Sequence, residues 1–173
     1  MHQFRQILSW EQKTSRSDIV ARGYQQMVAP EIITDTFWCQ NGRQRRGLDK
    51  ILTLENEEEI KIEEKFRRKA YPDIALETWS NLEDQVPGWC VKEIMADIVA
   101  YWIVPQQKFY VFQSTHLRRV LRENRSQWES SAEARINGFR YADARNEGYT
   151  TRSICVPLNV LENLLSIQLI EIH

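Results

Sequence analysis

The sequence lacks the features that mark several large classes of protein. Its three cysteines, Cys39, Cys90 and Cys155, are widely spaced and form no C-x-x-C pair. A disulfide framework and a structural zinc site are therefore both unexpected. No apolar run is long enough to cross a bilayer, and the segment from Met1 to Trp10 has no apolar signal-peptide core. These absences predict a protein of the reducing cytoplasm that does not enter a membrane.

The sequence also lacks a charge excess of either sign. Its net charge is −1, from 23 basic and 24 acidic side chains. Binding to nucleic acid would therefore have to come from local clusters of charge, because the overall charge provides no attraction. The 173 residues, of which 42% are hydrophobic and 27% charged, contain no internal repeat and no low-complexity linker. We therefore expect one domain over residues 1–173 with a core of ordinary size.

The order of elements predicts an α/β (α+β) fold, with a mixed central β-sheet flanked by helices. Hydrophobic spacing and capping residues predict the helices, and alternation of apolar and polar residues predicts the strands. Helices are expected from Ser15 or Ser17 up to Pro30, for one or two turns in Trp89–Met95, in Thr115–Trp128 and from Pro157 to Leu165. Strands are expected in Glu31–Trp38, Asp49–Leu54, Ile60–Phe66, Asp73–Trp79, Asp97–Val104, Lys108–Phe112 and Ile154–Val156. Ser130–Thr151 is expected to be a loop or hairpin.

Two consecutive strands carry carboxylates and a lysine opposite their apolar faces. Along Ile60–Phe66, side chains two residues apart share a face, so Glu63 and Lys65 project together. Adjacent strands lie about 4.8 Å apart, so Asp49 on the preceding strand can project beside them. Two carboxylates in this arrangement suit a hard divalent cation, which prefers oxygen ligands. The lysine beside them could orient a water molecule or stabilise a charged phosphate.

These residues resemble the motif of a known family of nucleases. Leu48-Asp49-Lys50-Ile51, followed by Ile62-Glu63-Glu64-Lys65-Phe66, is similar to the PD-(D/E)XK superfamily, which has the restriction-endonuclease-like fold. The resemblance extends to Asp73-Ile74-Ala75-Leu76-Glu77 and to the segment from Gly88-Trp89 to Tyr101, which are similar to small phage and bacterial members. It implies an αβββαβ core over roughly residues 15–125. It further implies Mg²⁺ or Mn²⁺ held by Asp49, Glu63 and the backbone carbonyl of Glu64, with Lys65 as the catalytic lysine.

Several residues near the motif have more than one interpretation. Glu64 replaces Glu63 as the second ligand if a bulge shifts the strand by one residue. Glu77, on the following strand, is either an auxiliary ligand or a surface carboxylate. Three loop arginines precede the motif and either grip phosphates or are simply solvated. These arginines are Arg43, Arg45 and Arg46.

The residues and the resemblance together predict a metal-dependent endonuclease that hydrolyses phosphodiester bonds in DNA. A homodimer is one way for such an enzyme to cut both strands. An RNA nuclease or a junction resolvase of the same fold is an alternative, since fold alone does not select the substrate. A further alternative is a non-catalytic nucleic-acid-binding or assembly protein that retains the nuclease fold.

Overall fold

The computed structural model describes residues 2–40 and 42–172, with side chains from residue 9 onward. The chain, for which the sequence predicts a single domain, folds into two compact units. Unit 1 comprises the described residues up to Ala70, Met95–Gln113 and those from Gln168. Unit 2 comprises Tyr71–Ile94 and Ser114–Ile167. No helix among the described residues is both long and apolar enough to cross a membrane.

Unit 1 is a mixed sheet with helices packed against it, as the predicted fold class requires. Its described elements are α1 (His2–Ser15), α2 (Asp18–Val28), β1 (Ile33–Trp38), α3 (Gly42–Arg45), β2 (Lys50–Leu54), β3 (Glu59–Arg67), β6 (Ile98–Ile103), η1 (Val104–Gln106), β7 (Lys108–Gln113) and β10 (Gln168–Glu171). The six strands of this sheet run in the order β1-β2-β3-β6-β7-β10. Only the β3–β6 pair is parallel, and the other neighbours are antiparallel.

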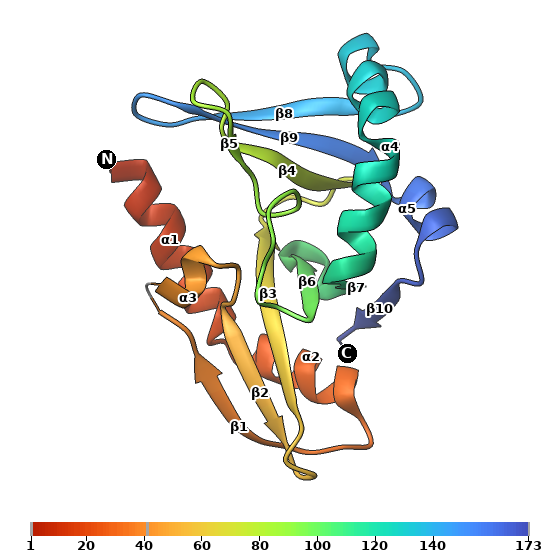
Figure 1. Cartoon of the computed structure of the whole chain (residues 1–173). Coiled ribbons are helices and arrows are strands. Elements are labelled where there is room, and N and C mark those ends of the chain that lie inside the picture. The colour runs from red at the N-terminus through yellow and green to blue at the C-terminus, as the bar shows by residue number, and fades with distance from the viewer. Residues whose placement is uncertain (1, 41, 173) are drawn as a thin grey trace. The chain divides into compact units, whose positions relative to one another are not determined.

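Helix α2 covers one face of this sheet (Figure 1). Ser17 caps its start, because its hydroxyl accepts a hydrogen bond from the Val20 amide. Val20 and Tyr24 are buried against β-strand residues, and the Tyr24 ring meets Trp102 edge-on at 5.5 Å between centroids. Gly23 permits this close approach, since a Cβ there would lie 2.6 Å from the Trp102 ring. One core cluster of unit 1 therefore lies between α2 and the strands next to it, and a second, smaller cluster contains Cys39, Leu48 and Ile51.

Unit 2 is built on a four-stranded sheet in the order β5-β4-β9-β8. Its described elements are β4 (Asp73–Asn81), β5 (Val86–Pro87), α4 (Ser114–Ala134), β8 (Arg140–Arg145), β9 (Thr150–Pro157) and α5 (Leu158–Leu164). Helix α4 packs against β8 and β9, crossing them at a steep angle (Figure 1). It buries the apolar residues Leu117, Val120 and Leu121 that its sequence places on one face.

The structure confirms most of the predicted elements and corrects two. The predicted third strand, Asp73–Trp79, exists as β4, but it belongs to the sheet of unit 2 and pairs with β5 and β9. The neighbours of β3 are instead β2 and β6, so Asp73–Trp79 does not continue the sheet that Asp49–Leu54 and Ile60–Phe66 form. The turns of helix predicted for Trp89–Met95 are also absent, and that segment contains only turns and bends. Helix α1 and strand β10 were not expected from the sequence.

Candidate functional site

The site begins where β2 and β3 pair. The register joins Lys50 to Ile62, and continuing it by one residue places Asp49 opposite Glu63. The Asp49 amide donates to the Ile62 carbonyl at 2.9 Å. The Asp49 carboxylate accepts a hydrogen bond from the Glu64 amide, also at 2.9 Å. These two bonds hold the Asp49 side chain against the edge of β3, just before β2 begins at Lys50.

Glu63 carries the most informative atom of the site. Its side chain is only 5% exposed, and its Oε1 accepts a hydrogen bond from Lys65 Nζ. Its other oxygen, Oε2, is buried and has no hydrogen-bond partner among the described residues. A buried carboxylate oxygen without a partner is costly, because it loses its hydration and receives nothing in return. The oxygen is therefore suited to a positively charged ligand from outside the chain.

Glu64 points away from Asp49, into the face of the sheet that α2 covers. Its Oε1 pairs with Lys50 Nζ at 2.8 Å and accepts a hydrogen bond from the Tyr24 hydroxyl at 2.7 Å. Its Oε2 accepts a hydrogen bond from the Ser15 hydroxyl at the end of α1. Both oxygens are thus satisfied within the protein. The arrangement favours Glu63 over Glu64 as the side chain available for a metal.

The backbone of Glu64 nevertheless faces the site. In a strand, the amide and carbonyl of one residue point to the same side, and residues two apart share that side. The Ile62 carbonyl and the Glu64 amide both bond to Asp49. The Glu64 carbonyl therefore points toward the same edge as the Asp49 carboxylate. It is a possible third oxygen ligand beside Asp49 and Glu63.

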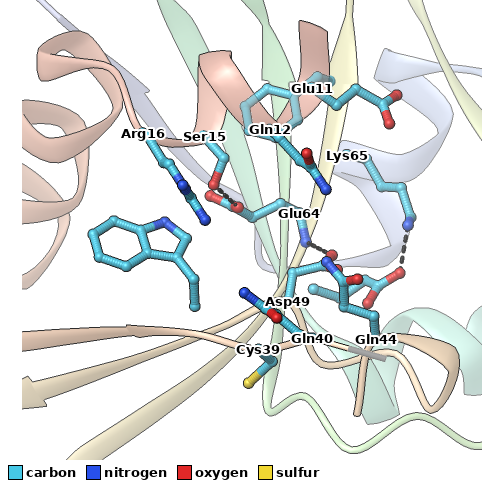
Figure 2. A pocket seen from close by; sticks show the side chains of 13 residues that line it. Glu11, Gln12, Ser15, Arg16, Cys39, Gln40, Gln44, Asp49, Glu64 and Lys65 are labelled. Atoms are coloured by element: carbon cyan, nitrogen blue, oxygen red, sulfur yellow. Dashed lines mark hydrogen bonds and ion pairs between the residues drawn. The ribbon is translucent and has the colours of Figure 1, made fainter. Parts of the chain in front are cut away.

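A pocket of about 510 Å³ contains these groups (Figure 2). Its lining residues come from α1, from β3, and from the segments around α3 and the start of β2, all within unit 1. They are Glu11, Gln12, Ser15, Arg16, Trp38, Cys39, Gln40, Gln44, Asp49, Glu63, Glu64, Lys65 and Phe66. In Figure 2, the Lys65 and Asp49 side chains lie in the same part of the pocket, and Gln40 and Gln44 lie beside Asp49. The pocket is large enough for a nucleotide-sized ligand.

Two acids of the pocket titrate abnormally. Burial, together with the negative charge of Glu63, raises the pKa of Asp49 from 3.8 to about 7, although Lys65 and the Glu64 amide act against the shift. Burial also raises the pKa of Glu11 on α1, and the positive charges of Lys65 and Arg68 oppose this. Without another cation, Asp49 therefore tends to keep a proton up to about neutral pH.

These residues fit a hard divalent cation. No group of three or more His, Cys, Asp or Glu side chains in the described part of the chain is arranged to hold a metal by itself. Magnesium, however, usually keeps several waters and binds proteins through one or two carboxylates. Asp49, Glu63 and the Glu64 carbonyl form a donor set of that kind. Glu63 Oε2 has no hydrogen-bond partner among the described residues, and this favours the binding of a cation at the site.

The structure places the other predicted site residues outside this cluster. Glu77 lies on β4 in unit 2, so it is not on a strand next to β3. The arginines Arg43, Arg45 and Arg46 are exposed, and the first two lie in the short helix α3 rather than in a flexible loop. The Arg43 guanidinium lies over the Phe37 ring at 5.6 Å. Their contact with phosphates stays a prediction.

Sequence reasoning missed a buried network behind the site. Lys50, with a 2% exposed side chain, bonds to Glu64 and to the Ser15 carbonyl. Its ammonium also lies 4.6 Å from the Tyr24 ring centroid. Burial lowers the pKa of Lys50, while Glu64 acts in the opposite direction. One signal was present: Lys50 and Glu64 are opposite charges on the apolar faces of adjacent strands.

The abnormal pKa of Asp49 leads to a testable pH dependence. Its folded pKa of about 7 exceeds its ordinary value of 3.8, so the folded protein binds an additional proton between these pH values. The contribution to stability is therefore fully present below pH 4 and is lost as pH rises toward 7. We expect the metal-free Asp49→Asn variant to lack this loss. The upper limit is about 1.4 kcal/mol per pH unit, and solvent screening at the half-buried Asp49 reduces it.

Urea unfolding in EDTA at pH 5, 6, 7 and 8 measures this effect. Asp35→Asn, at an exposed aspartate on β1, serves as the matched control and should keep the wild-type pH profile. If the stability of Asp49→Asn depends on pH as that of the wild type does, the raised pKa of Asp49 is not the cause of the pH dependence.

We compared the chain with family models, curated protein sequences and solved structures. No family model, no curated protein sequence and no solved structure matches this chain.

Proposed function

We propose that this protein is a metal-dependent phosphodiesterase that cleaves nucleic acid, with DNA as the expected substrate. The observation that carries the proposal is the unpartnered, buried Oε2 of Glu63 in a pocket that also contains Asp49 and Lys65. Asp49, Glu63 and the Glu64 carbonyl would hold Mg²⁺ or Mn²⁺. When bound, such an ion supplies an activated water and neutralises charge on the phosphate oxygens.

Lys65 has a separate role in this proposal. Its ammonium bonds to Glu63, yet its side chain is 28% exposed and lines the pocket. From there it can donate a hydrogen bond to a phosphate oxygen, where negative charge develops as the ester is cleaved. A compact ammonium suits this role, because it has three donors and a flexible stem.

Other residues of the pocket support a nucleic-acid substrate. Trp38 is 39% exposed at the pocket, and the Arg16 guanidinium lies over its ring at 5.7 Å. An exposed aromatic ring provides a surface on which a base can stack. Amide side chains also line the pocket, and amides can read base edges through paired hydrogen bonds. These amides belong to Gln12, Gln40 and Gln44.

Stacking on Trp38 gives a prediction of its own. A base–aromatic contact contributes about 1–3 kcal/mol. Trp38→Ala should therefore weaken binding of a single-stranded oligonucleotide in EDTA about tenfold or more, whereas Trp38→Phe should retain most of it. Fluorescence anisotropy of a labelled strand measures both variants. Equal binding by Trp38→Ala and the wild type would exclude the stacking role.

The proposed activity is tested by incubating the full chain with supercoiled plasmid. Nicked or linear product should form with Mg²⁺ or Mn²⁺ and should not form in EDTA. A nicked product indicates action on one strand at a time, and a linear product indicates two sites acting together, as in a homodimer. A parallel panel of single-stranded DNA, RNA and branched DNA identifies the preferred substrate. Salt-sensitive binding with no cleavage under either metal would support the non-catalytic alternative instead.

A further inference from the structure

Unit 2 contains a second pocket, of about 350 Å³, that the proposed activity does not use. One wall is a face of α4, and another is the segment that follows β5. The lining residues all belong to unit 2: Cys90, Val91, Glu93, Thr115, Arg118, Arg119, Leu121, Arg122 and Arg125. This pocket combines apolar groups with a concentration of positive charge.

Four arginines of one helix contribute to this pocket. They are Arg118, Arg119, Arg122 and Arg125. Arg118, Arg122 and Arg125 are spaced by four and three residues, so they share one face of the helix. The lining contains one acid, Glu93, against these four cations. In a chain whose net charge is −1, this is a strong local excess of positive charge.

Internal partners neutralise little of this charge. Glu93 is 94% exposed and lies 3.8 Å from Arg118, at the limit of an ion pair. Arg125 is committed elsewhere, since it pairs with Glu129 at 2.8 Å and lies 4.9 Å from the Trp79 ring centroid. Arg119 and Arg122 are exposed. An anion entering the pocket would therefore meet up to three guanidinium groups.

The Arg118 side chain contains a buried donor without an acceptor. Its Nε is buried and has no hydrogen-bond partner among the described residues. A desolvated donor on a charged group is costly when it is unpaired. Because the guanidinium is a planar fork, an oxyanion with two or more oxygens can satisfy Nε and a neighbouring nitrogen together.

We propose that this pocket binds a phosphate ester attached to a nucleoside, either as a free nucleotide or as part of a nucleic-acid strand. Several guanidinium groups suit a phosphate, because its free oxygens can accept hydrogen bonds from more than one guanidinium, whereas a carboxylate is satisfied by one. Val91 provides apolar surface for a sugar or base, and guanidinium planes also stack on flat rings. The pocket has a volume typical of small-ligand sites. The Cys90 thiol plays no part, since it donates to the Glu77 carbonyl at 2.6 Å.

This site is for binding rather than for cleavage, and it does not rest on the proposed nuclease activity. Its lining has no pair of carboxylates comparable with Asp49 and Glu63. The two proposals can therefore fail separately. Binding to unit 2 is measured in EDTA, where metal-dependent cleavage does not occur.

The test is calorimetric titration of the full chain in EDTA with deoxythymidine monophosphate and with uncharged thymidine. We expect the nucleotide to bind at least tenfold more tightly than thymidine. Arg118→Gln should weaken nucleotide binding at least tenfold. Arg145→Gln, at an exposed arginine on β8 of the same unit, is the matched control and should change it less than twofold. Because Arg118 is partly buried, the exposed pair Arg119→Gln and Arg122→Gln provides an independent variant with the same expected loss.

A twelve-nucleotide strand in the same titration distinguishes the two sources of the phosphate. Tighter, salt-dependent binding of the strand indicates nucleic acid, and equal binding indicates a free nucleotide. Two results would overturn the proposal. One is nucleotide binding no tighter than thymidine binding. The other is nucleotide binding that survives both arginine variants but is lost in Trp38→Ala, which would place the ligand in the pocket of unit 1.

Discussion

Glu63→Gln is expected to reduce metal-dependent cleavage at least about a hundredfold, the loss typical of removing one group that stabilises the transition state. Glutamine has nearly the same shape as glutamate, but it is neutral and replaces one carboxylate oxygen with a poor metal ligand. The variant therefore keeps the β-sheet intact while removing the unpartnered Oε2 from the site. Plasmid cleavage and Mn²⁺ binding by calorimetry should both be impaired.

Glu59→Gln is the matched control for this variant. Glu59 lies on the same strand and the same face as Glu63 but is exposed at the far end. It should cleave and bind Mn²⁺ like the wild type. Lys65→Met should separate metal binding from stabilisation of the phosphate. It should lose cleavage while keeping its Mn²⁺ affinity within a few fold of the wild type. Full cleavage by Glu63→Gln would contradict the proposed site.

Lys50→Met is expected to destabilise the protein by about 3–5 kcal/mol, the usual effect of removing one partner from a buried ion pair. The Lys50 and Glu64 side chains are 2% and 4% exposed, so Glu64 would be left as an uncompensated buried charge. Tyr24 and Ser15 would still donate to it, but neither supplies a positive charge. Urea unfolding at pH 7 measures the loss.

The double variant Lys50→Met/Glu64→Gln distinguishes the ion pair from simple loss of packing. The glutamine that replaces Glu64 is uncharged, and its amide oxygen can still accept from Tyr24, so the double variant should recover at least half of the loss. Lys61→Met, on the opposite face of β3 from Glu64, should change stability by less than about 0.5 kcal/mol. A double variant as unstable as Lys50→Met alone would show that the charge of Glu64 is not the cause.

The local arrangement of the site was predictable because a strand alternates strictly between its two faces. Glu63 and Lys65 share a face, and the structure pairs them directly. The register of β2 against β3 also followed from the apolar positions, since a shift by one residue would expose Ile62, which is completely buried. This is why the sequence alone could place Asp49 beside Glu63.

The order of strands was not predictable in the same way. β4 follows β3 closely along the chain and carries a similar pattern, yet it joins the other sheet. Alternation reports which face of a strand is buried and contains no information on which strand lies next to it. The parallel pairing of β3 with β6 arises from contacts between residues far apart in the sequence, such as Ile62 and Ile98. For the same reason the role of Glu77 could not be judged from its spacing.

The orientation of the Glu64 side chain could not be predicted, because it depends on contacts with residues far away in the sequence. An acid on an apolar face looks anomalous in isolation, and a bulge that exposes it is one explanation. The structure instead retains regular pairing and satisfies the carboxylate with Lys50, Tyr24 and Ser15. The Ser15 contact comes from the end of α1, a helix that was not expected.

The central claim is that Asp49 and Glu63 hold a divalent cation, and anomalous diffraction from a crystal soaked in Mn²⁺ tests it most directly. The account predicts one strong anomalous peak within ligand distance of an Asp49 carboxylate oxygen and of Glu63 Oε2. That peak should be absent from crystals of Glu63→Gln prepared in the same way. A peak only at other residues, or none between these two carboxylates at saturating Mn²⁺, would contradict the account.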